Sequence, residues 1–428
     1  MGGKTRKTQG TLPAIKPAAG RARALAVILP VYTVAFFVAK DGHEAQIFLG
    51  LLAWFALSLV TSSISVALAS ALGARLVWVT IGAGPKLDTR VVGGRVRVIR
   101  ALPISLSGVM APKPEHFLRD WRIITSVGLF GQPVLGAIAI LLLPTPAGVV
   151  IATVAVITLV LRLTMREPTS GRSLGARMFL AASPQNDPAV ASADRQLASQ
   201  GGVAVQFGDV DQAEAILARL RTDPAAAQST ALLAVELLAA RGEFDAALRV
   251  RFPEPDPAES PALTDARRAI DSARNANLLL LATERDPSLA PKAAPLALRH
   301  LRAVTKAKTA ATADRSGRAL YALQAGDLRA AVRESRVCVV RAKMPLAIAD
   351  ALCTRALIEA RRGKPAKAVK ILGDAARFAP WYPRVAHVRQ LVDSGAAMAL
   401  TTGYAADPMS DTSHVFDEPW SVPAASES

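Results

Sequence analysis

The sequence predicts an all-α fold in the main: a polytopic helical membrane domain of about four spans with a small cytoplasmic β layer, followed by an α-solenoid. Three observations predict this class: four apolar stretches in the first third, a β-branched segment between two of them, and a helical repeat in the alanine-rich second half. Hydrophobic residues make up 51% of the 428 residues, and the mean hydropathy is +0.29, which is more apolar than usual for a soluble chain. The length also suggests more than one hydrophobic core.

The four apolar stretches are candidate membrane spans within a membrane domain over 24–180. The second is long enough, at about 1.5 Å per residue, to cross a hydrocarbon core of about 30 Å, whereas the others are shorter and need snorkelling Arg or Lys at their ends. The first could instead be a cleaved signal peptide, but no clear cleavage motif follows it, which favours an uncleaved anchor. The stretches are 24–39, 47–72, 127–143 and 149–161.

Charge asymmetry predicts how these spans are oriented. The arm 1–23 carries six basic residues and no acid, and the connection 73–126 carries nine basic residues against three acidic ones. The short connections 40–46 and 144–148 have almost no positive charge, so they belong outside. The sequence therefore predicts a multi-pass protein of the cell membrane with both termini in the cytoplasm.

The net charge of +17 invites a nucleic-acid interpretation. Residues 1–180 hold 20 Lys and Arg against 6 acidic residues, however, and 181–428 hold 31 against 28. The excess therefore lies beside the apolar stretches, as the positive-inside rule requires. We expect the lipid bilayer as a partner and no nucleic acid. The two cysteines, Cys338 and Cys353, are too few for a disulfide framework and are expected to be buried, reduced thiols.

The segment 77–109 predicts a small β-hairpin layer at the membrane face. Its runs "VWVTIGAGP" and "VVGGRVRVIRALPISLSGV" are alternating and β-branched, and Gly-Gly and Pro interrupt them.

A repeat is visible from 191 to 390. The strings "GDVDQAEAILARLRTDP" and "GEFDAALRV" begin 34 residues apart, and the same pattern returns twice, with glycine before a helix and alanine five residues later. The stretch 264–306 supplies further helices whose repeat signature is not legible. The four glycines are Gly208, Gly242, Gly326 and Gly363.

The last copy, "GKPAKAVKILGDAARFAP", resembles a tetratricopeptide repeat. Gly363, Ala368, Ala375 and Pro380 fall at that family's turn glycine, two small packing positions and closing proline. The resemblance implies an α-solenoid of tetratricopeptide type, whose extended concave surface binds a protein or peptide. The tail 391–428 contains no Lys or Arg and is predicted to be disordered and acidic; its "HVFDEPW" is either a docking motif or part of a solvated tail.

The membrane part resembles the site-2 protease family of intramembrane zinc metallopeptidases over about 55–179. A long membrane helix, the "IGAGP" run, "RALP" and then "GLFGQPVLG" follow one another in that family's order. The motif residues are Gly73, which ends the helix, Gly82, Gly84 and Pro85, then Pro103, Gly131 and Pro133.

In that family the first core helix carries H-E-x-x-H, whose two His bind zinc from one helix face while the Glu polarises water. Counting back from Gly73 and from Pro85 gives the same register. Thr61 and Ser65 hold the places of the two His, and Ser62 holds that of the base. The third ligand, an Asp, corresponds to Ser170. The resemblance implies that these positions are degenerate, with no catalytic residue, no metal and no cofactor.

The residue types inside the spans agree with this prediction. No His, Asp, Glu, Lys or Cys occurs within 47–72, 127–143 or 149–161, and chemistry in lipid needs such groups. The five His show no ligand spacing, at positions 43, 116, 300, 387 and 414. The expected role of the small residues is close helix packing. They form a stripe of Ser58, Ser62, Ser65, Ala69 and Gly73.

The sequence thus predicts a catalytically inactive site-2-protease-like membrane protein whose cytosolic repeats bind a protein partner. Two alternatives stay open. The first is an active intramembrane zinc metalloprotease with atypical ligands. The second is a membrane transport component, which would need polar lining, although the spans offer only Ser, Thr and Gln132. The predicted domains are 1–23, a basic cytoplasmic arm; 24–180, the membrane domain; 191–390, the repeats; and 391–428, the tail.

Overall fold

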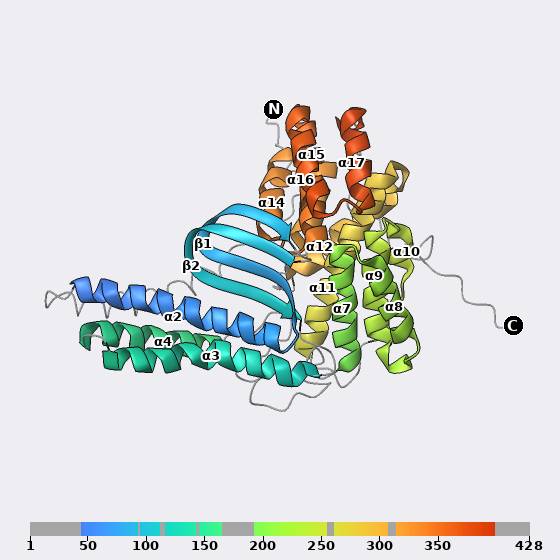
Figure 1. Ribbon diagram of the computed structural model, residues 1–428. Helices are drawn as coiled ribbons and strands as arrows, with labels where there is room; N and C mark the ends of the chain where they lie inside the picture. Colours follow the sequence, from blue (N-terminus) through green and yellow to red (C-terminus); the bar gives the residue numbers. More distant parts are fainter. Residues whose placement is uncertain are drawn as a thin grey trace, which may run out of the picture. The chain divides into compact units, whose positions relative to one another are not determined.

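The structure is a computed structural model that describes residues 44–92, 95–111, 116–142, 145–164, 192–254, 261–306 and 314–398. It is predominantly helical with one small sheet, which confirms that part of the predicted fold class (Figure 1). The chain divides into two compact units between Gln196 and Leu197. We describe each unit by itself.

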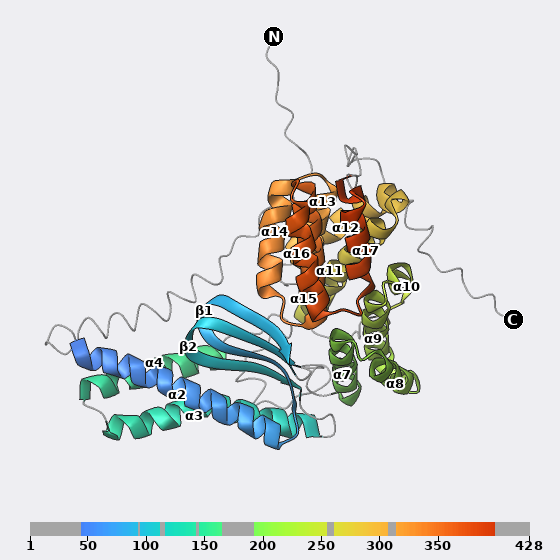
Figure 2. The same cartoon turned by 45° about the horizontal axis from the view of Figure 1, so that its top comes forward.

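The first unit contains three helices that contact one another and a sheet that contacts the first of them. Figures 1 and 2 show the sheet lying along α2, with α3 and α4 beside that helix. The predicted arm 1–23 and first apolar stretch 24–39 lie outside the described residues. The elements are α2 (Glu44–Ala71), β1 (Arg75–Val92), β2 (Arg95–Ala111), α3 (Phe117–Leu142) and α4 (Thr145–Thr164).

Two helices in the described part of the chain are long and apolar enough to cross a membrane, over Ala45–Ala71 and Arg119–Leu142. The apolar part of α4, Pro146–Val160, is shorter. Helices therefore lie at three of the four predicted stretches, and two of them have spanning length. Only 17% of each long apolar window is buried, so most of its surface faces outward, unlike the core helix of a soluble protein.

Gly73 ends α2 as predicted. Its φ of +74° is a left-handed conformation that glycine adopts without strain. The backbone N–H of Gly73 donates to Ser70 O at 3.0 Å and that of Ala74 donates to Ala69 O at 2.9 Å, which closes the last turn. The chain then enters the sheet two residues after this glycine.

The predicted β layer is confirmed as a sheet of two long strands, β1 and β2, which pair antiparallel from Val92↔Arg95 outward. β1 bends near Gly82, whose φ is +94°. Residues 78–81 consequently pair twice with β2, once with 96–99 and once with 106–109. In the first set the residue numbers rise together in β1 and in β2. These parts of the two strands therefore run parallel. Because the strands bend and pair in this way, Val77, Val96 and Val98 are buried in the small sheet.

The second unit is a succession of helices, many of them joined by short turns. Its first part contains α7 (Ala193–Phe207), α8 (Val210–Arg221), η2 (Pro224–Ala226), α9 (Ala227–Ala240) and α10 (Phe244–Arg249). Its second part contains α11 (Pro261–Arg285), η3 (Pro287–Leu289), α12 (Ala290–Lys306), α13 (Asp314–Gln324), α14 (Leu328–Arg341), α15 (Pro345–Arg361), α16 (Pro365–Phe378), α17 (Pro383–Asp393) and η4 (Ala396–Met398).

Each predicted repeat glycine lies in the turn between two helices and has a φ between +73° and +81°. The alanine five residues later is at most 2% exposed in every copy, because it faces the other helix of its pair. Ala375 is buried as well, and Pro380 lies in the turn before α17. The pairs are α7–α8 at Gly208, α9–α10 at Gly242, α13–α14 at Gly326 and α15–α16 at Gly363.

The stretch 264–306 forms a further pair, α11 and α12, with a different turn. Asp286 and Pro287 begin a short 3₁₀ helix there, and the backbone N–H of Ser288 donates to the Asp286 carboxylate at 3.0 Å. An Asp-Pro turn needs no glycine, because proline fixes φ and the Asp side chain caps the next turn. This is why the glycine-based pattern was not legible in this stretch.

Helices of the second unit that are far apart in the sequence contact one another. Arg384 of α17 bonds to Glu284 of α11, one hundred residues earlier. The Trp381 indole lies so close to Gly208 that a β-carbon there would overlap it, and the backbone N–H of Ala347 donates to Gln206 at 3.3 Å.

Candidate functional site

Two of the positions that the site-2 protease resemblance singles out lie in the contact between α2 and α3. Thr61 is 2% exposed and Ser65 is 8% exposed. A β-carbon at Gly131 would lie 2.7 Å from Cγ2 of Thr61, and one at Gly128 would lie 3.7 Å from Oγ of Ser65. The two helices therefore approach at glycines of α3, and no space for an imidazole ring exists between Thr61 and Gly131 as they stand.

The hydroxyls of this part of α2 are bonded within the helix. Thr61 Oγ1 donates to Leu57 O at 2.8 Å, and Ser65 Oγ donates to Thr61 O at 3.0 Å. Ser63 Oγ likewise donates to Leu59 O at 2.9 Å. A nucleophilic hydroxyl needs a base that takes its proton, whereas these protons are held by backbone carbonyl oxygens. The arrangement supports a packing role for these side chains.

The buried face of α2 differs slightly from the predicted stripe. Ser65 and Ala69 are buried as predicted, but Ser62 and Ser58 are only half-buried. Thr61, which is not in that stripe, is buried instead. Positions four residues apart stay on one helix face, so the contact runs through Thr61, Ser65 and Ala69.

The other motif residues lie in two places. Gly82, Gly84 and Pro85 are in β1 and Pro103 is in β2, whereas Gly131 and Pro133 are in α3. Ala83 pairs with Leu102 across the sheet, so the structure brings the "IGAGP" and "RALP" segments together. Ser170 lies outside the described residues. Among the residues that are described, no group of three or more His, Cys, Asp or Glu could hold a metal ion.

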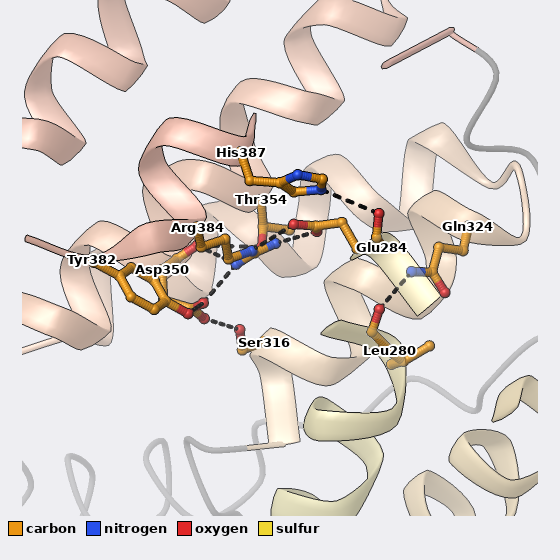
Figure 3. Close-up of polar contacts among 9 residues, drawn as sticks. All are labelled: Leu280, Glu284, Ser316, Gln324, Asp350, Thr354, Tyr382, Arg384 and His387. Atoms are coloured by element: carbon orange, nitrogen blue, oxygen red, sulfur yellow. Dashed lines mark hydrogen bonds and ion pairs between the residues drawn. The ribbon is translucent and has the colours of Figure 1, made fainter. Parts of the chain in front are cut away.

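A polar network that the sequence did not predict lies in the second unit (Figure 3). Its centre is the Arg384 guanidinium, which donates to both oxygens of Glu284 at 2.8 and 2.6 Å and to Asp350 Oδ1 at 2.6 Å. The side chains of Arg384 and Glu284 are almost completely buried. A bidentate pair of this kind is strong and fixes the relative orientation of its two partners.

Further donors complete the surroundings of Asp350. Tyr382 Oη and Ser316 Oγ each donate to this carboxylate at 3.1 Å, and Arg384 also donates to Thr354 Oγ1 at 3.0 Å. Burial by itself lowers the pKa of Arg384, but Glu284 and Asp350 outweigh burial and hold that pKa well above its ordinary value. Burial and then Asp350 raise the pKa of Tyr382. Arginine and tyrosine therefore keep their protons.

This network joins α11, α13, α15 and α17, one polar residue or more from each. Its bonded partners are 30 to 100 residues apart in sequence, so no local motif could have indicated it. In the sequence each appears as an ordinary charged or polar helix residue. We assign it a structural role, because its groups satisfy one another.

The two thiols lie beside this network. Cys353 is buried and Cys338 is half-buried, and both are free. Burial first, and the nearby Asp350 in addition, raise the pKa of Cys338 to about 11; burial is also the main reason that the pKa of Cys353 is about 12. Such thiols remain protonated near neutral pH and are poor nucleophiles.

We compared the chain with known proteins by family, by sequence and by structure. No protein family, no curated protein and no solved structure matches it. The resemblances to the site-2 protease family and to tetratricopeptide repeats therefore depend on the residues of this chain alone.

Proposed function

We propose that the protein is a membrane-anchored adaptor: its first unit is a non-catalytic, site-2-protease-like membrane domain, and its helical repeats bind a protein partner in the cytoplasm. The observation that carries this proposal is the packed contact of Thr61 with Gly131, which gives the degenerate site a structural use. The repeats then supply the activity, which is binding.

The outward apolar surface of α2 supports membrane anchoring. Large apolar side chains recur every three or four residues along one side of the helix and are 37% to 69% exposed. Removing apolar surface from water is worth about 25 cal/mol per Å². A bilayer removes this apolar surface from water along the whole helix. Four crossings with both termini in the cytoplasm also fit the charge pattern. The side chains are Phe48, Leu52, Phe55 and Leu59.

The outer helices of the repeats support partner binding. Val340 of α14 is 63% exposed and Val369 of α16 is 48% exposed, and both stand among basic residues. Both valines face solvent, so a partner can reach them. Exposed apolar groups surrounded by charge are typical of protein-binding surfaces.

Crosslinking in native membranes tests the binding role. We expect the full chain to give a crosslinked partner whose yield falls strongly in the Val340→Glu, Val369→Glu variant. Ile270→Glu is the matched control, since Ile270 is a partly exposed apolar residue of α11. Equal loss in the control, or no loss in the double variant, would contradict binding by the outer helices.

Metal analysis of the detergent-purified chain tests the non-catalytic role. We expect no stoichiometric zinc, because hydroxyls at 61, 65 and 170 are poor zinc ligands beside imidazole and carboxylate. Zinc bound at one equivalent within the membrane unit would instead favour an active intramembrane metalloprotease with atypical ligands.

A further inference from the structure

A cluster of unbalanced positive charge lies at the end of α15. The Glu359 side chain is completely buried there, and its Oε1 is 2.5 Å from Arg355 Nη2, 3.2 Å from Arg362 Nη1 and 3.4 Å from Lys367 Nζ. The Arg355 guanidinium also donates to Ser335 Oγ of α14 at 3.1 Å. The cluster therefore joins α14, α15 and the start of α16.

Three cationic side chains contact this one carboxylate, and a fourth lies nearby. The fourth is Arg336 of α14, which lies near enough that its charge, after burial, lowers the pKa of Arg355. The negative charge of Glu359 neutralises one of these four positive charges, so a net charge of three remains. Arg362 and Lys367 reach solvent, with 33% and 52% of their side chains exposed. A nearby anion would relieve the mutual repulsion of these groups.

The cluster continues into a larger basic surface on α14 and α16, which lie beside each other in Figures 1 and 2 and both contact α15. The acidic groups of these two helices are already paired: Glu334 with Arg315 and Arg333, and Asp374 with Arg377. We call this surface the basic face. Its exposed members are Arg329, Arg333, Arg336, Arg341, Arg362, Lys364, Lys367 and Lys370.

We propose that the basic face is the docking site of the acidic segment at this chain's own C-terminus, residues 407–427. Charge complementarity carries the proposal, because this segment has five acidic residues and no Lys or Arg. It also contains Phe416 and Trp420, which suit the exposed Val340 and Val369 of the same two helices. The acidic residues are Asp407, Asp411, Asp417, Glu418 and Glu427.

The place where the described chain ends permits this docking. η4, over Ala396–Met398, contacts α15, the helix that carries Arg355 and Glu359. The 19 residues from Met398 to Asp417 can span up to about 60 Å when extended. α15 is only about 25 Å long, at about 1.5 Å per residue. Attachment to the same chain also gives the segment a high effective concentration at the basic face.

Photo-crosslinking of the full chain in detergent tests the proposal. The docked segment would cover the valines that the proposed adaptor function gives to a partner, but the crosslink itself needs no partner. A benzoylphenylalanine replaces Phe416, and mass spectrometry identifies the crosslinked peptides. We expect crosslinks to α14 and α16 within one chain. Arg336→Glu with Lys367→Glu should lower their yield about fivefold, as the loss of two exposed ion pairs would. Lys292→Glu with Arg302→Glu, exposed positions on α12, is the matched control.

Reversal of the tail charges provides a second arm that leaves the described helices unchanged. Asp417→Lys with Glu418→Lys should lower the crosslink yield by itself and restore it in the Arg336→Glu, Lys367→Glu chain. The proposal is overturned if crosslinks fall elsewhere, if they join two copies at high dilution, or if both charge reversals leave them unchanged. Crosslinking in anionic nanodiscs adds one more outcome: exclusive reaction with lipid would assign the basic face to the membrane and overturn the proposal.

Discussion

At the scale of single residues, the repeat glycines share one backbone conformation but differ in their surroundings. Gly208 and Gly363 have φ values of +79° and +73°. A β-carbon at Gly208 would overlap the Trp381 indole, whereas one at Gly363 would meet nothing within 4 Å. We predict that Gly363→Ala costs about 1–2 kcal/mol for the left-handed conformation alone. Gly208→Ala should cost about 2–5 kcal/mol, because overpacking is added.

Thermal melting of the full chain in detergent measures this difference, and a second variant isolates its cause. In a Trp381→Ala background the two alanine substitutions should have nearly equal effects, since the overlapping ring is gone. Unequal effects in that background would show that another contact of Gly208 matters.

The contact between Thr61 and Gly131 makes a second prediction at this scale. Gly131→Ala should destabilise the first unit, because the new β-carbon would lie 2.7 Å from Cγ2 of Thr61, a β-branched side chain that cannot move aside freely. Gly128→Ala is the control, since its β-carbon would lie at an ordinary 3.7 Å from Ser65. Thr61→Ser removes Cγ2 and should rescue Gly131→Ala. Detergent stability assays that rank both glycine variants equally would contradict the packing.

The thiols make a third prediction. With a pKa of about 11, the thiolate fraction of Cys338 at pH 8 is about a hundredfold smaller than that of an ordinary thiol, so iodoacetamide should alkylate it about a hundredfold more slowly. Cys353, buried and with a pKa of about 12, should react only after denaturation. Quantifying the two alkylated peptides by mass spectrometry checks both. Rapid labelling of Cys353 in the native chain would show that α15 opens.

At the scale of the helices, the ion network of Arg384 decides how α17 meets α11 and α15. Removing the guanidinium leaves Glu284 and Asp350 buried without their partner, a change that typically costs about 3–5 kcal/mol. We therefore predict that Arg384→Met strongly destabilises the repeats at pH 7. Arg389→Met, an exposed arginine of the same helix, should be nearly neutral.

At the scale of the whole molecule, the charge pattern predicts the topology. Fusion tags after Gly20 and at Ser428 should both report the cytoplasm, and a reporter inserted between Lys40 and Ala45 should report the outside. The reason is that connections rich in basic residues are expected to stay in the cytoplasm. An external signal from the C-terminus would contradict four crossings.

The amino-acid sequence by itself determined the features that depend on neighbouring residues. The end of α2 at Gly73, the turns at Gly208, Gly242, Gly326 and Gly363, and the β-branched sheet were all predictable. In each, the permitted backbone dihedrals or the side-chain period decide the local structure. The buried alanines five residues after each glycine belong here too, since helix geometry fixes the face that meets the partner helix.

Only the tertiary structure decided the features that depend on contacts between distant residues. The packing of Thr61 against Gly131 selects one face of α2, whereas the serines made an adjacent face equally plausible in the sequence. The closure of α17 on α11 needs Arg384 to meet Glu284 across one hundred residues. The balance of charge around Glu359 likewise exists only once α14, α15 and α16 are assembled. The energy of such a pair depends on the distance between its two charges and on their burial. Neither can be read from the separation of the two residues in the sequence.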